Sequence, residues 1–239
     1  MKILALSTST PRGSAVVVEG RDVVGAGGYV DLQGHAERIF EAIDAALAAA
    51  GLDRSAVAAL ACDQGPGSFT GVRVGVASAK GIALGLAIPL VGVISLEAMA
   101  AAAFGEGAAT AADVVLAAID AKKDEVFVAA YTLVDGVVRE LAPPRCAPRA
   151  ASALEIPGET RRIVIIGEVV ASLDPPPPGL VRAPALDLPD AAWVGRVAAI
   201  RLAAGVAADP ALLEPLYVRP PDATPLATPP TPTREDPPA

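Results

Sequence analysis

The segment GPGSFTGVRVG at residues 65–75 combines residue types whose spacing points to binding chemistry. Its glycines permit positive φ angles and a close approach of the backbone to another group. Its hydroxyl side chains can cap a following helix, whose free N–H groups attract anions. Two interpretations stay open: a loop that docks a phosphate or a partner, and a tight strand-to-helix turn. The candidate residues are Gly65, Pro66, Gly67, Ser68, Phe69, Thr70, Gly71 and Arg73.

The few possible metal ligands exclude several catalytic classes. The chain has one histidine and two cysteines, so we expect no HExxH or Cys₂His₂ zinc site, no zinc ribbon and no iron–sulfur cluster. Cys62 and Cys146 are far apart in sequence, and we expect inert thiols rather than a disulfide. The loop is no Walker A motif either, because Lys80 lies nine residues beyond Gly71 instead of directly after the last glycine.

Charge and hydropathy limit the partners and the location. Lys and Arg number 19 and Asp and Glu number 27, so the net charge is −8, and an acidic chain binds nucleic acid phosphates poorly. The longest uncharged apolar stretch has 16 residues between Lys80 and Glu97 and is interrupted by Pro89. A membrane-spanning helix needs about 20 apolar residues. We therefore expect no membrane span, no signal peptide and a cytoplasmic protein.

The apolar pattern of the first half predicts a three-stranded meander followed by alternating helices and strands. Ile39, Ile43 and Leu47 recur at the spacing of one helix face. We expect Ser95 to cap the last helix of this half. The expected strands are 3–6, 14–19, 23–28, 57–62 and 89–94, and the expected helices are 35–50, 72–86 and 95–104.

The second half repeats this order, which predicts two related α/β lobes. Its expected strands are 114–119, 125–133, 137–141 and 161–166, followed by a helix that Asp190 caps and that ends near 204. We expect lobes at 1–104 and 105–219, with the terminal helix packing back on the first lobe. A proline-rich surface loop at 175–179 and a disordered tail at 220–239 complete the chain.

Several segments match one family in collinear order over residues 1–221. They are ILALSTST (3–10), GPGSFTGVRVGVASAKGIA (65–83), IPLVGVISLEAMA (88–100), IDAKKDEVFVAAY (119–131) and LEPLYVRPP (213–221). In these segments the sequence resembles the bacterial TsaB (YeaZ) family of threonylcarbamoyladenosine biosynthesis proteins. The resemblance implies an actin-like ATPase (ASKHA) fold with two ribonuclease-H-like lobes, whose mixed sheets are flanked by helices.

The resemblance also implies a function. It points to a non-catalytic subunit that stabilises and activates a catalytic TsaD-type subunit, which transfers a threonylcarbamoyl group to the adenosine beside the anticodon in tRNAs reading A-starting codons. A TsaE-type ATPase would join them, tRNA would be contacted only through the complex, and the isolated chain would form a homodimer. The chain would need no cofactor of its own, with a nucleotide at the TsaD interface as an open alternative. The competing functions are a stand-alone actin-fold phosphotransferase and a homodimeric binding module.

Three positions argue against catalysis by this chain. The catalytic paralogue carries a metal-binding HxxxH motif where this sequence has Ser95 and Met99, which are poor ligands for a divalent metal. Actin-like ATPases place an Asp after the first strand to hold magnesium, and Ser7 stands there. Asp120 could serve a similar role in the second meander, or it is a carboxylate at a strand end. We therefore predict no catalytic and no metal-binding residues.

The family resemblance implies that helices 35–50 and 72–86 carry the dimer interface. For the apolar residues among its members, the core of the lobe is the alternative. Arg73 and Lys80 could meet a nucleotide or tRNA phosphate, or lie on a solvated face. The expected interface residues are His35, Ile39, Ile43, Val72, Val76, Ala79, Lys80 and Ala83.

Overall fold

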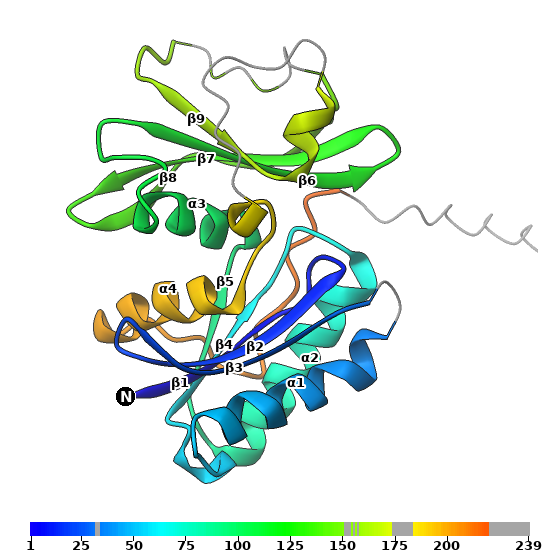
Figure 1. The fold of residues 1–239 in the computed structure, drawn as a ribbon, viewed down its shortest axis with the longest axis vertical. Helices are drawn as coiled ribbons and strands as arrows, with labels where there is room; N and C mark the ends of the chain where they lie inside the picture. Colours follow the sequence, from blue (N-terminus) through cyan, green and yellow to red (C-terminus); the bar gives the residue numbers. More distant parts are fainter. Residues whose placement is uncertain (32–33, 151–153, 155, 157, 174–183, 220–239) are drawn as a thin grey trace, which may run out of the picture.

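The computed structural model describes residues 1–219 except 32–33, 151–153, 155, 157 and 174–183. It has two lobes, each built on one β-sheet (Figure 1). The expected surface loop at 175–179 and the expected tail at 220–239 lie outside the described residues.

The first sheet contains the predicted meander and two further strands in the order β3-β2-β1-β4-β5. β1 pairs antiparallel with β2 and parallel with β4, so the carboxyl ends of β1 and β4 meet at one edge of the sheet. The strands are β1 (Lys2–Ser7), β2 (Arg12–Glu19), β3 (Asp22–Val30), β4 (Ala59–Asp63) and β5 (Leu90–Val93).

Helices cover both faces of the first sheet. Alternate residues of β1 and β2 pack against α1 and α2 on one face and against α4 on the other. α3 contributes to the core of the first lobe and packs on the second sheet, so α3 and α4 lie between the sheets (Figure 1). The helices are α1 (His35–Ala49), α2 (Phe69–Leu86), α3 (Ser95–Gly105) and α4 (Ala191–Ala203), with the short 3-10 turn η1 (Arg54–Ala56).

The second sheet repeats the meander in the order β8-β7-β6-β9. α3 covers one face, while η3 and neighbouring residues cover the other. The elements are β6 (Val114–Lys122), β7 (Glu125–Val134), β8 (Val137–Pro148), β9 (Ile163–Ile166), η3 (Glu168–Ser172) and η4 (Pro184–Leu186).

Element ends differ from the predictions where capping or strand position decides them. α2 begins at Phe69 rather than Val72, because the Ser68 side chain accepts from the Gly71 N–H and caps it. Ser95 is the first residue of α3 and makes no capping bond, so the prediction that it caps this helix is wrong. β8 continues past two prolines because it is an edge strand, which tolerates missing N–H donors.

Asp190 caps α4 as predicted, its side chain accepting from the Ala192 N–H. No helix within the described residues is long and apolar enough to cross a membrane.

Candidate functional site

The glycine-rich loop joins the end of β4 to α2 and is held by the end of β1. The Ser68 N–H donates to the Ser9 carbonyl at 2.7 Å, and the Thr8 hydroxyl donates to the Gly71 carbonyl at 2.8 Å. Ser68, Phe69 and Thr70 are exposed beyond these contacts. The segment is therefore a strand-to-helix turn that presents its own side chains at the surface.

The residues expected at the dimer interface, apart from Lys80, are buried within the chain instead. Their side chains are at most 3% exposed, because the apolar stripes of α1 and α2 pack against β1, β2 and β4. For the apolar residues among them, this burial supports the core alternative. The corrected residues are His35, Ile39, Ile43, Val72, Val76, Ala79 and Ala83.

The outer faces of the same two helices carry large apolar side chains in solvent. Phe40 on α1 is 45% exposed, and Phe69 and Leu84 on α2 are 46% and 56% exposed. α1 and α2 are in contact and lie side by side on the sheet (Figure 1). We call the surface formed by Phe40, Phe69, Arg73 and Leu84 the outer helix face.

Arg73 and Lys80, for which phosphate binding was one expectation, hold the C-terminal segment. The Arg73 guanidinium lies 3.6 Å from the centre of the Phe69 ring, and its Nε donates to the Tyr217 hydroxyl at 2.7 Å. Lys80 Nζ donates to the carbonyls of Ala211 and Leu213, each at 3.0 Å. Both cations therefore bind residues that follow them by more than a hundred positions.

A pocket of about 1090 Å³ lies between the two lobes. The first lobe supplies the turn between β1 and β2 and the glycine-rich loop, the second lobe supplies the end of β6, and the C-terminal segment closes one side. Its walls are formed by residues 9–11, His35, 66–70, Val72, 119–122, Phe127, Arg149, 168–169, Ser172 and 216–219.

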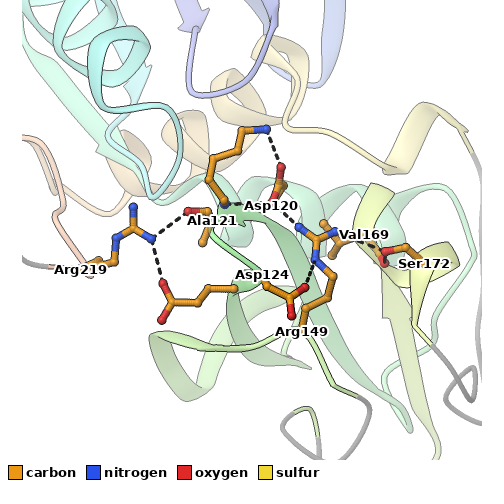
Figure 2. A network of polar contacts seen from close by, with 9 residues as sticks. Asp120, Ala121, Asp124, Arg149, Val169, Ser172 and Arg219 are labelled. Atoms are coloured by element: carbon orange, nitrogen blue, oxygen red, sulfur yellow. Dashed lines mark hydrogen bonds and ion pairs between the residues drawn. The ribbon is translucent and has the colours of Figure 1, made fainter. Parts of the chain in front are cut away.

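Asp120 lies in this pocket at the centre of a network of charges within the second lobe (Figure 2). Its carboxylate accepts from the Lys122 N–H at 2.9 Å and pairs with Lys122 Nζ and Arg149. Burial raises the pKa of Asp120, but the bonds from Lys122 and the charge of Arg149 outweigh it and hold the pKa below its usual value. Both oxygens thus already have cationic or N–H partners from their own lobe.

Comparison with known proteins places the chain in a family. Residues 31–178, more than half of the chain, match the family model "TsaD: tRNA N6-adenosine threonylcarbamoyltransferase". The chain is 40% identical over 131 residues to the tRNA threonylcarbamoyladenosine biosynthesis protein TsaB of Escherichia coli, covering 55% of each chain. The structure of YeaZ from Pseudomonas aeruginosa superposes with a TM-score of 0.78 at 29% identity, over 90% of this chain and 99% of that one. The chain belongs to the TsaB/YeaZ family.

This family membership agrees with the two-lobed architecture, which is the actin-like fold with two mixed sheets flanked by helices. An uncharacterized protein of Mycobacterium tuberculosis is 36% identical over 227 residues, covering 94% of this chain and 95% of that one. The likeness therefore extends over both lobes.

The strand ends of this TsaB/YeaZ protein do not fit a magnesium–nucleotide pair in the interlobe pocket. Ser7, at the position to which the family resemblance assigns a magnesium-binding carboxylate, has a hydroxyl that donates to buried Asp63 at 2.6 Å. Asp120 is occupied by Lys122 and Arg149. Among the described residues, no group of three or more His, Cys, Asp or Glu could hold a metal ion.

The two positions that the family resemblance matches to a metal motif of the catalytic paralogue are buried. Ser95 is 0% exposed and Met99 is 1% exposed, with Met99 packed in the core beneath the second sheet. Between them, Glu97 pairs with Arg201 of α4 at 2.6 Å. This stretch of α3 therefore joins the two lobes instead of lining a site.

His35 is the first residue of α1 and its ring is buried at the edge of the interlobe pocket. Nδ1 lies 2.9 Å from the Tyr29 hydroxyl, and burial lowers the pKa of the imidazole. The contact with Tyr29 therefore holds this polar side chain within the chain at the start of α1.

Sequence reasoning missed Phe40 and Asp63. Phe40 follows Ile39 directly, so it must project away from the Ile39–Ile43 stripe, and an apolar residue on the polar side of an amphipathic helix was the available signal. Asp63 ends the apolar strand β4 and is 0% exposed. The available signal was a charged residue at the end of an apolar strand, which an analysis of hydrophobic periodicity does not detect.

Proposed function

We propose that this chain is the non-catalytic partner subunit of the complex that transfers a threonylcarbamoyl group to tRNA adenosine, and that the outer helix face docks a TsaD-type catalytic subunit. The observation that carries the proposal is the exposure of Phe40, Phe69 and Leu84 on two adjacent helices of a TsaB/YeaZ family member. Large apolar side chains exposed on adjacent helices are candidates for a protein contact.

Two further observations support a supporting rather than a catalytic role. Ser95 and Met99 are buried, and their hydroxyl and thioether are poor ligands for a divalent metal. The pocket between the lobes offers an Asp120 whose oxygens are bound within the chain. Chemistry on tRNA would then take place on the partner subunit.

The remaining parts of the proposal concern the assembly. A TsaE-type ATPase joins the complex, and the isolated chain pairs with itself through the outer helix face that the TsaD-type subunit otherwise occupies. The chain holds no cofactor of its own, while a nucleotide at the interface of the two subunits is the open alternative. tRNA is reached through the complex, and the protein acts in the cytoplasm.

Reconstitution of tRNA modification tests the function. The TsaD-type and TsaE-type proteins of the same organism are assayed for threonylcarbamoyl transfer with and without this chain. We expect transfer to require the chain, and full transfer in its absence would refute the proposal. Tight binding of Mg-ATP to the isolated chain, followed by phosphate transfer, would favour the stand-alone phosphotransferase.

Phe40→Asp tests the docking face. A buried aromatic at the centre of an interface contributes about 2 kcal/mol or more, so affinity for the TsaD-type subunit should fall about thirtyfold. Leu141→Asp is the matched control, because Leu141 is 41% exposed on the second lobe. Calorimetric titration of both variants measures the affinities. Equal weakening by both, or by neither, would place the contact elsewhere.

A further inference from the structure

Asp63 is a fully buried carboxylate that collects hydrogen bonds from the end of the neighbouring strand. The hydroxyls of Ser7 and Ser9 both donate to its Oδ2, at 2.6 and 2.7 Å. Its Oδ1 is buried and has no hydrogen-bond partner within the described residues. Burial raises the pKa of Asp63, while bonds from Ser7, Ser9 and the backbone of Thr8 and Ser9 lower it. A buried carboxyl is costly unless it is hydrogen-bonded, so these donors keep it in place.

The strand end that Asp63 binds is also what holds the start of α2. Ser9 accepts from the Ser68 N–H at 2.7 Å through its carbonyl, and Thr8 donates to the Gly71 carbonyl at 2.8 Å through its hydroxyl. A continuous path of hydrogen bonds therefore runs from Asp63 through Ser9 to the capping residue of α2.

Two glycines of the loop lie very close to the backbone at the end of β1. A Cβ atom on Gly67 would lie 2.2 Å from the Ser9 carbonyl oxygen, and one on Gly71 would lie 2.1 Å from the Thr8 carbonyl oxygen. Both contacts are with backbone, which cannot move aside as a flexible side chain could. Glycine at these two positions therefore lets the loop backbone approach the end of β1 more closely than any residue with a side chain would allow.

We propose that Asp63 is a positioning residue that fixes the end of β1 against the loop, and thereby sets where α2 begins and how Phe69 and Arg73 stand on the outer helix face. The docking partner named in this inference rests on the proposed function, whereas the positioning of the loop by Asp63 does not. Asp63 is not part of the pocket wall, and its carboxylate contacts the chain at the end of β1 through the hydroxyls of Ser7 and Ser9.

Asp63→Val and Asp63→Asn separate positioning from general stability. Valine leaves two buried hydroxyls without their acceptor, whereas the amide of asparagine keeps one acceptor oxygen. Amide exchange of the isolated chain, followed by nuclear magnetic resonance, reports the Ser68 N–H. We expect Asp63→Val to speed exchange at Ser68 by at least about tenfold, and Asp63→Asn to keep most of the protection.

Val91→Ala is the control, because Val91 is buried in the same sheet on β5 and packs in the core with residues of α3 and α4 instead of holding the start of α2. Exchange is compared after correction for the global stability of each variant. Equal exchange at Ser68 in Asp63→Val and Val91→Ala would overturn the proposal. If Asp63→Val does not fold, Ser9→Ala replaces it, since this change removes one donor and leaves Asp63 in place. Unchanged Ser68 exchange in Ser9→Ala would equally overturn the proposal.

Affinity for the TsaD-type subunit distinguishes the positioning role of Asp63 from docking on the outer helix face. The positioning role predicts weaker binding by Asp63→Val and rescue by Asp63→Asn. Faster Ser68 exchange with unchanged affinity supports the positioning role and refutes docking on the outer helix face. Loss of affinity without faster exchange overturns the positioning role.

Discussion

Two buried aspartates of this chain are stabilised by different partners, and their pKa values move in opposite directions. Asp113 accepts from Arg162 at 2.8 and 2.7 Å and from the N–H and hydroxyl of Thr110, and these bonds hold its pKa well below the usual range. Asp63 is surrounded by hydroxyl and backbone donors, so burial dominates and raises its pKa. The charged guanidinium of Arg162 therefore lowers the pKa of its carboxylate partner, whereas the neutral donors around Asp63 do not offset the effect of burial.

Asp113→Asn should make the free energy of unfolding less dependent on pH in the acidic range. The folded-state pKa of Asp113 lies below its usual value of 3.8, so its contribution is present above about pH 4 and is lost as pH falls toward the folded-state value. We expect the variant to be about 2 kcal/mol less stable at pH 7, as for a hydrogen-bonded charged group. Urea unfolding between pH 7 and pH 3 measures the difference. A gap that stays constant over this range would contradict the assignment.

The helix α1 has two faces with different consequences. Ile39 and Ile43 lie under the helix in the core of the first lobe, while Phe40 stands outside. A helix that covers a sheet with one stripe can bind a partner only with residues outside that stripe. The resemblance identified the element, and the packing of α1 on β2 and β3 decided which residues it offers.

Ile43→Ala and Phe40→Ala should therefore separate stability from binding. Truncating Ile43 removes buried methyl groups and leaves a cavity, which costs about 2–5 kcal/mol. Phe40→Ala is a surface change and should alter unfolding by no more than about 0.5 kcal/mol. Chemical unfolding of the isolated chain measures both. A destabilisation by Phe40→Ala equal to that of Ile43→Ala would show that Phe40 is part of the core.

At the scale of the molecule, the C-terminal segment ties the two lobes together (Figure 1). The Leu216 N–H donates to the Gln64 carbonyl of the first lobe at 2.6 Å. Three residues later, Arg219 donates to the Ala121 carbonyl at 3.0 Å and to Glu125 at 2.8 Å in the second lobe (Figure 2). The segment also forms one wall of the interlobe pocket, so its position affects the width of that pocket.

Arg219→Ala should widen the range of distances between the lobes. A partly exposed ion pair contributes about 1 kcal/mol or less, so global stability should change little. The expected result is a broader distance distribution between spin labels placed on α1 and on β8. Arg161→Ala is the control, since Arg161 pairs with Glu159 and Thr132 within the second lobe. An unchanged distribution in Arg219→Ala would show that other contacts hold the lobes.

The amino-acid sequence by itself determined the order and type of the main elements. Alternation and helical spacing depend on residues a few positions apart, so both meanders and α1, α2 and α4 were predicted close to their observed bounds, except that β8 continues to Pro148. The segment LEPLYVRPP and the glycine-rich loop were each recognised as family motifs, but the sequence did not indicate that they contact each other.

Only the tertiary structure decided which residues these elements bring together. Ser7 and Asp63 are 56 positions apart, and Arg73 and Tyr217 are 144 positions apart. The burial of the apolar stripes of α1 and α2, and the exposure of Phe40, likewise depend on which face meets the sheet. Contacts over such separations depend on the packing of the whole chain, whereas local periodicity records only the neighbours of each residue.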